Sequence, residues 1–335
     1  MSLIKNILYV CYFSLLSANI LLVPEDYFSI QSAINDATNN DTILVNSGEY
    51  VENIFIDNLS ISLIALNGPN NTIINGNNIE SVVNINSPGE NVLIRGFTIS
   101  YGTGNVLDSG SSFGGGIISN NTMITLDSLI IQNNESFAGG GVCIYSMDNS
   151  QTHSIIKNST IQNNIASEGG GIFIINQSLD IHNTIIYNNG IVPYGSGGGI
   201  QALVANINIY DSSIINNHSR FGGGIYIGSS NSYIENVMIS DNLSDSKGGG
   251  IWLGSNSQLN IIKSLITNNT ADGFGGGIFV NLSDIIINQT TIANNIVSPA
   301  VSGAGIYADG GDVTIQNSII YFNRKENNES INYNL

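Results

Sequence analysis

The feature that most constrains this chain is a glycine triplet that recurs at a nearly fixed interval. Seven copies read Gly-Gly-Gly and an eighth carries one alanine; their first residues are Gly114, Gly139, Gly169, Gly197, Gly222, Gly248, Gly275 and Gly303. Between the third residues of the first and last copies, Gly116 and Gly305, the seven intervals average 27 residues. A fixed period of this length is typical of solenoids, whose repeated units stack on one another.

An asparagine keeps step with the triplet. It follows the third glycine by 18 residues in six of the eight copies, and an isoleucine stands three residues before it. These asparagines are Asn134, Asn164, Asn189, Asn217, Asn242, Asn269, Asn295 and Asn323. Each unit therefore combines a stretch of nearly constant length with one variable loop, which precedes the next triplet.

Alternating apolar residues follow each triplet. Ile225 and Ile227 flank Tyr226, and Ile251 and Leu253 flank Trp252. Alternation with a period of two indicates a strand with one buried face. Because the unit contains no helical pattern, it favours an all-β solenoid, a parallel β-helix whose inward isoleucines form columns.

Stacking also explains the asparagines and glycines. Equivalent residues of neighbouring coils lie about 4.8 Å apart, so we expect each Asn amide to bond to the Asn above and below it. Asn also tolerates the left-handed backbone of a corner, and glycine allows positive φ or close approach at another corner. We therefore expect a structural role for both markers rather than ligand binding.

The N-terminus has the features of a secretory signal, predicted over residues 1–18. Lys5 supplies a positive charge, residues 7–16 are mostly apolar, and Ser17-Ala18 suit cleavage. The alternative is an uncleaved anchor, because residues 20–23 extend the apolar run. With the signal removed, no transmembrane segment is expected and Cys143 is the single cysteine.

The mature chain is expected to have three parts. Residues 19–100 form an N-terminal cap and the first coils, residues 101–323 the repeated coils, and residues 324–335 a polar tail. An amphipathic helix over residues 28–38 is the candidate cap. The tail either folds over the last coil or marks the chain as a fragment of a longer protein.

Several segments resemble a known superfamily. Residues 23–34, 41–45, 72–76 and 94–99 are similar to the opening coils of pectin-lyase-like right-handed parallel β-helix proteins. The later units resemble the repeats of polymorphic outer-membrane proteins, although Ile replaces Phe in the second motif. The resemblance covers residues 23 to about 323 and implies the right-handed fold. It does not imply one activity, since the superfamily holds lyases, hydrolases and adhesins.

Composition limits the partners. The chain has 8 Lys+Arg against 25 Asp+Glu, a formal charge of −17. A nucleic-acid partner is not expected, because such proteins carry a basic face. A polyuronate would be repelled unless cations bridged it to the protein.

The alternative enzymatic hypothesis places charged groups in the variable loops. The loops before successive triplets contain Arg220, Asp245, Lys247 and Asp272. The two Asp residues each stand three residues before the first glycine of their triplet, so their carboxylates would lie about 5 Å apart, as in retaining glycosidases. The chain would then be a polysaccharide lyase or glycoside hydrolase, with Ca²⁺ if a lyase; no cofactor is otherwise expected. The competing interpretation is that these charges only keep the solenoid soluble.

The favoured hypothesis is binding. One step beyond the first inward residue of each unit lies an outward column whose members include five aromatic residues, Phe173, Tyr226, Trp252, Phe279 and Tyr307. Exposed, they would stack on sugar rings or anchor a protein contact; alternatively, they form a ladder that stiffens the sheet or is covered by a loop. We therefore expect a protein that is secreted or held at the outer-membrane surface, binding a polysaccharide or a host or neighbouring cell surface, with no catalytic residue assigned.

Overall fold

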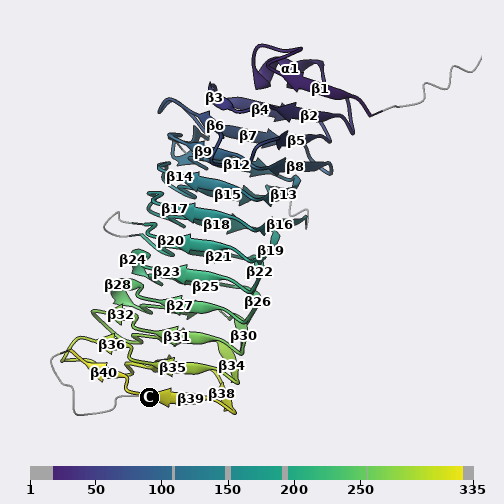
Figure 1. Cartoon of the computed structure of the whole chain (residues 1–335). Coiled ribbons are helices and arrows are strands. Elements are labelled where there is room, and N and C mark those ends of the chain that lie inside the picture. The colour runs from purple at the N-terminus through teal and green to yellow at the C-terminus, as the bar shows by residue number, and fades with distance from the viewer. Residues whose placement is uncertain (1–17, 108–109, 148–151, 191–194, 255, 327–335) are drawn as a thin grey trace, which may run out of the picture.

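The computed structural model describes residues 18–107, 110–147, 152–190, 195–254 and 256–326. They form an all-β parallel solenoid of about 10 turns (Figure 1). The predicted signal, apart from residue 18, and residues 327–335 of the predicted tail lie outside the described residues. Within the described residues, no helix is long and apolar enough to cross a membrane.

Three long parallel sheets form the walls. The 12-stranded sheet contains β1 Ile20–Val23, β2 Thr42–Val45, β5 Ser62–Ala65, β8 Asn91–Arg95, β13 Met123–Asp127, β16 His153–Lys157, β19 Ser178–His182, β22 Asn206–Tyr210, β26 Asn231–Glu235, β30 Gln258–Ile262, β34 Asp284–Asn288 and β38 Val313–Gln316. The 10-stranded sheet contains β4 Ile54–Asp57, β7 Val83–Asn86, β12 Ile117–Asn120, β15 Val142–Tyr145, β18 Ile172–Ile175, β21 Ile200–Leu203, β25 Ile225–Gly228, β29 Ile251–Gly254, β33 Ile278–Asn281 and β37 Ile306–Asp309.

The third wall is the 11-stranded sheet, which contains β3 Gly48–Val51, β6 Thr72–Asn75, β9 Thr98–Ser100, β14 Ile130–Gln132, β17 Thr160–Gln162, β20 Ile185–Tyr187, β23 Ser213–Ile215, β27 Met238–Ser240, β31 Leu265–Thr267, β35 Thr291–Ala293 and β39 Ile319–Tyr321. A smaller 5-stranded sheet comprises β24 His218–Phe221, β28 Leu243–Lys247, β32 Thr270–Ala271, β36 Ile296–Val297 and β40 Arg324–Lys325. An antiparallel pair, β10 Asn105–Val106 and β11 Ser112–Phe113, forms a separate two-stranded sheet.

The core consists of the predicted isoleucine columns. Ile186, Ile214 and Ile239 pair in register in the 11-stranded sheet and are fully buried. The column of the 12-stranded sheet that includes Ile209 and Ile234 is equally buried. Burying a side chain of this size contributes about 1.5–3 kcal/mol, so one long core runs through the molecule and stabilises the stack.

The asparagine ladder is confirmed. Asn217 donates from its Nδ2 to Asn242 Oδ1 at 3.0 Å, and its Oδ1 accepts from Asn189 Nδ2 at 3.1 Å. The left-handed corner, however, belongs to the preceding residue: Asn216 has φ 55°, and Asp241 has φ 57° at the same corner of the next coil. The predicted corner conformation was therefore placed one residue too late, because the marker Asn points inward to form the ladder.

The glycine triplets turn the chain in two ways. The first glycine takes positive φ, for example 62° at Gly222. The third packs against the next coil: a Cβ added at Gly224 would lie 2.6 Å from the carbonyl oxygen of Gly250. Both predicted uses of glycine are therefore present within one triplet.

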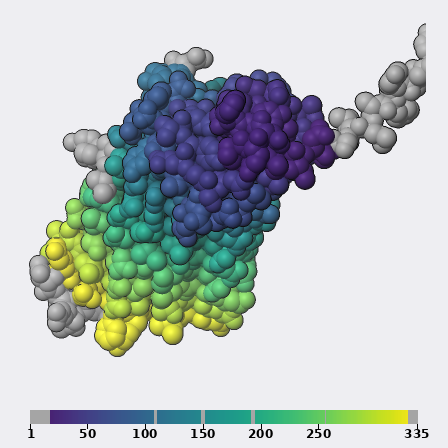
Figure 2. All heavy atoms as spheres, turned by 45° about the horizontal axis from the view of Figure 1, so that its top comes forward, coloured from purple at the N-terminus to yellow at the C-terminus, as the bar shows by residue number. Residues whose placement is uncertain are grey.

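The predicted N-terminal helix is present but shorter. α1 spans Ile30–Asp36, begins at the N-cap Ser29 and buries Ile30, Ala33 and Ile34. It packs against β1, β2 and β4 at the end of the solenoid opposite the C-terminal coils (Figures 1 and 2). Its role as a cap remains a prediction, as does the division of the chain at residue 100.

Candidate functional site

The aromatic column predicted beside the glycine triplets is continuous. Tyr226, Trp252, Phe279 and Tyr307 pair in register on the 10-stranded sheet. The Tyr226 and Trp252 rings stack with centroids 4.1 Å apart, and Phe279 and Tyr307 stack at 5.7 Å. The geometry of the column therefore follows the predicted register.

The expected exposure of this column was wrong. Trp252 is 9% exposed, Phe279 1% and Phe173 7%, while Tyr226 and Tyr307 are half-buried. The variable loops lie over the sheet: Lys247 Nζ is 4.6 Å from the Phe279 ring centroid. The Phe274 ring lies 4.3 Å from that of Tyr307. These loops exclude most of the solvent that a bound sugar would replace.

Cys143, which belongs to the same outward column, is also buried. Its thiol is fully buried, in a cluster with Ile118, Ala138 and Phe173. Burial raises the pKa of the thiol far above its usual range. The column and the loops above it thus form a second apolar layer outside the main core.

The candidate catalytic residues lie in or beside the 5-stranded sheet. Ser244 pairs with Ala271, so Asp245 and Asp272 follow paired positions on neighbouring strands. Asp245 Oδ1 lies 2.7 Å from His218 Nε2, and the Arg220 guanidinium lies 5.1 Å from the Phe221 ring centroid. With Lys247 over the Phe279 ring, Arg220, Asp245 and Lys247 each contact a different neighbour. Their catalytic role remains a prediction.

A second group of aromatic side chains lies on the outward face of the 12-stranded sheet. His182 and Tyr210 pair in register and stack with ring centroids 4.8 Å apart and planes 10° from parallel. Tyr233, on the next strand, lies 5.7 Å from Tyr210. All three are partly exposed. We call His182, Tyr210 and Tyr233 the ring strip.

Carboxylates flank the ring strip. Asp180 Oδ1 accepts from Asn208 Nδ2 at 2.8 Å, and Asp180 Oδ2 lies 2.9 Å from His153 Nε2. On the other side, Glu235 accepts hydrogen bonds from the Tyr233 hydroxyl and from Lys263 Nζ, both at 2.9 Å. The strip therefore offers apolar ring faces bordered by groups that hydrogen-bond.

The ionisation states follow from these contacts. Hydrogen bonds from Lys263 and Tyr233 lower the pKa of Glu235. Partial burial, together with the neighbouring carboxylates, raises the pKa of Tyr210 and of Tyr233. At neutral pH the strip thus presents two neutral phenols beside a carboxylate, which supplies both donors and acceptors.

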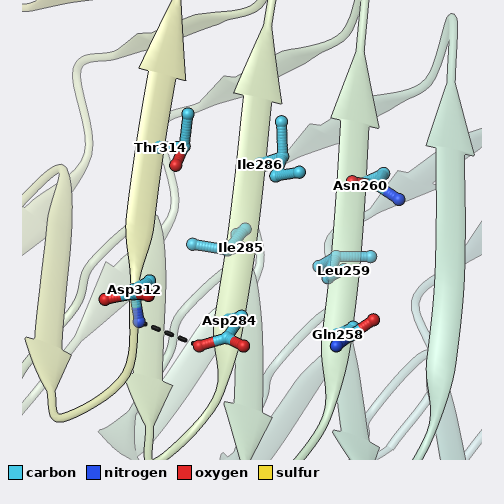
Figure 3. A pocket seen from close by; sticks show the side chains of 8 residues that line it. All are labelled: Gln258, Leu259, Asn260, Asp284, Ile285, Ile286, Asp312 and Thr314. Carbon is cyan, nitrogen blue, oxygen red and sulfur yellow. Dashed lines mark hydrogen bonds between the residues drawn. The ribbon is translucent and has the colours of Figure 1, made fainter.

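A shallow hollow of about 280 Å³ continues the face towards the C-terminus. Figure 3 shows Asp312, Asp284 and Gln258 in one row of its lining, and Thr314, Ile286 and Asn260 in another. The Asp312 N–H donates to Asp284 Oδ1 at 2.9 Å. Asn260, one of the lining residues, pairs in register with Tyr233. We call the ring strip and this hollow together the sheet face.

Sequence reasoning missed the sheet face although a signal existed. His182, Tyr210 and Glu235 each lie seven residues before a marker asparagine. They therefore occupy one outward column of the strand that ends before the corner. The column beside the triplets is richer in aromatic residues, so the sequence favoured that column as the binding site.

Within the described residues, no group of three or more His, Cys, Asp or Glu side chains could hold a metal ion. Asp284 and Asp312, which both line the hollow, are joined by a hydrogen bond from the Asp312 backbone N–H to the Asp284 carboxylate.

Known proteins share the architecture. The family profile "Right handed beta helix region" matches residues 115–297, and no curated protein matches the sequence. Among solved structures, a mannuronan C-5 epimerase A-module from Azotobacter vinelandii is 16% identical over 88% of this chain and 92% of its own, with a TM-score of 0.49.

Two further structures are similar at lower scores. A pectin methylesterase from carrot is 13% identical over 91% of this chain and 84% of its own, with a TM-score of 0.41. The Dettilon tailspike protein is 12% identical over 89% of this chain and 68% of its own, with a TM-score of 0.42. Identities this low transfer neither an activity nor a ligand.

Proposed function

Because this chain belongs to the right-handed β-helix family, whose fold does not define one activity, we propose a function from its surface: it is a secreted or cell-surface protein that binds a polysaccharide on its sheet face. The observation that carries the proposal is the ring strip, in which His182, Tyr210 and Tyr233 lie partly exposed on adjacent strands. The export signal predicted over residues 1–18 supports the extracellular location.

The chemistry of the sheet face suits a sugar polymer. Aromatic ring faces provide flat apolar area for the C–H face of a sugar ring, and their few rotatable bonds limit the entropy lost on binding. Asp180 and Asn208 beside the rings, and Asn260 further along, accept or donate hydrogen bonds to hydroxyls.

The shape of the sheet face favours an extended ligand over a small one. The hollow is shallow and the ring strip crosses three consecutive strands, β19, β22 and β26. Successive strands lie about 4.8 Å apart, so a polymer lying across the strands contacts several coils at once. Small-ligand sites, by contrast, are usually concave and enclose most of the ligand.

The test begins with a glycan array probed with the purified full chain, followed by titration calorimetry on the strongest hit. Tyr210→Ala and Tyr233→Ala should each weaken binding about tenfold, since about 1.4 kcal/mol lost from one stacking contact is a factor of ten. Tyr187→Ala is the matched control, because Tyr187 is a partly exposed tyrosine on the 11-stranded sheet. Circular dichroism should be unchanged in all three variants.

Unchanged affinity in both strip variants would rule out the sheet face as the site. The same mixtures, assayed for released reducing ends and unsaturated uronates, test the enzymatic alternative. Product that disappears with Asp245→Ala and Asp272→Ala would favour catalysis at the 5-stranded sheet instead.

A further inference from the structure

The charges of the 12-stranded sheet are unevenly distributed. Its strands contain four carboxylates and two basic side chains other than histidine. The carboxylates are Asp127, Asp180, Glu235 and Asp284, and the basic residues are Arg95 and Lys157. Asp312 adds a fifth carboxylate immediately before β38, and Lys263 a third cation immediately after β30. The face a ligand would meet is therefore acidic.

Each of these cations already lies beside a carboxylate. Arg95 Nε is 3.0 Å from Asp127 Oδ2, and Lys157 Nζ is 3.9 Å from the same oxygen. Lys263 Nζ is 2.9 Å from Glu235 Oε1. Among the described residues, the remaining lysines and arginines lie in strands of the 5-stranded sheet. Because Arg95 and Lys157 share the single Asp127 carboxylate, the surplus positive charge of this sheet lies on β8 and β16, on the opposite side of the ring strip from the hollow.

The two histidines near the ring strip each contact a neighbouring side chain. His153 contacts the Asp180 carboxylate, and His182 stacks on Tyr210. Beyond the ring strip, Asp284 and Asp312 border the hollow and are exposed. A carboxylate-bearing sugar that occupies the hollow would therefore meet a protein carboxylate close by.

We propose that the sheet face selects an uncharged polysaccharide and rejects its carboxylated counterpart. The inference rests on the proposed function and adds the ligand's charge class. The rings, amides and carboxylates bind hydroxyls and sugar C–H surface, whereas the acidic border supplies the discrimination by like-charge repulsion. Negative selection of this kind needs no contact with a specific sugar.

The experiment uses chemically matched polymers. Laminarin, pullulan and hydroxyethylcellulose are each compared with their C6-oxidised forms, which carry a uronate carboxylate on the same backbone, by affinity electrophoresis with the full chain. The native form of the bound polymer should bind at least about fivefold more tightly, which corresponds to one like-charge contact of about 1 kcal/mol in water. In 1 M salt the difference should shrink, because the screening length falls to about 3 Å.

A double variant, Asp284→Asn with Asp312→Asn, identifies the source of the discrimination. An amide oxygen at position 284 can still accept the hydrogen bond from the backbone of residue 312. The ratio of native to oxidised affinity should fall towards one, with circular dichroism unchanged. A ratio that stays at the parental value would overturn the proposal.

The outcomes separate the two levels of inference. Oxidised polymers that bind as tightly as the native forms, or more tightly, refute the charge selection and leave polysaccharide binding standing. If none of the six polymers binds and no glycan on the array binds, the proposed function is overturned, and the charge selection with it.

Discussion

The buried asparagine column offers the sharpest test of how the coils hold together, through the substitution Asn217→Asp. The Asn217 side chain is fully buried and donates two hydrogen bonds, to the Ile186 carbonyl and to Asn242 Oδ1, both at 3.0 Å. A carboxylate donates none, so two buried acceptors would face a negative oxygen. At about 1–3 kcal/mol for each unsatisfied group, the cost is about 2–6 kcal/mol.

The assay is urea unfolding followed by circular dichroism, read as the shift in midpoint because repeat proteins need not unfold in one step. The matched control is Asn216→Asp, one residue away on the exposed corner, where the next coil already has Asp241 in the same left-handed conformation. The control should unfold at nearly the parental concentration. Equal midpoints for Asn217→Asp and the parent would refute the ladder as a source of stability.

The pH dependence of Asn217→Asp supplies a second check. Burial against acceptors raises the pKa of the substituted carboxyl in the folded state, so between the two pKa values the folded chain binds more protons than the unfolded one. The stability deficit is therefore full above the folded-state pKa and shrinks as the pH falls from there towards the unfolded-state pKa. A deficit that grows on acidification, relative to the parent, would contradict this explanation.

Two further predictions concern the covered aromatic layer. Trp252→Ser should lower the free energy of unfolding by about 3–5 kcal/mol, the range for deleting a large buried aromatic side chain. Glycan affinity measured below the melting transition should stay at the parental value. Lost affinity in a fully folded variant would show that the binding site lies on this column. The Cys143 thiol is fully buried and its pKa is raised. It should therefore not react with a thiol-reactive chromogenic disulfide until urea unfolds the chain. Rapid reaction of the native protein would show that the layer opens readily.

Much of the fold was readable from period and alternation. The 27-residue spacing predicted stacked coils, and the Ile residues around Tyr226 predicted a strand with one inward face. These inferences hold because they depend on local chemistry repeated many times. A column such as Ile186, Ile214 and Ile239 needs only a constant length of chain per turn to come into register.

The site was less predictable, because exposure depends on residues distant in the sequence. Whether Phe279 faces solvent is decided by Lys247 at the end of β28, which belongs to the preceding coil. The lengths of the loops before the triplets vary from unit to unit, so the repeat carries no signal for where they fold. Tyr210 and Tyr233, by contrast, are partly exposed, and the chain turns directly after Tyr210 at Asp211, which has φ 49°.

By itself, then, the sequence determined the stacked architecture, the inward columns and the asparagine ladder, because each follows from backbone geometry repeated at a constant interval. Only the tertiary structure decided which outward column meets solvent. That choice depends on where irregular loops lie, and here they cover the rings of Trp252 and Phe279 and leave the ring strip accessible.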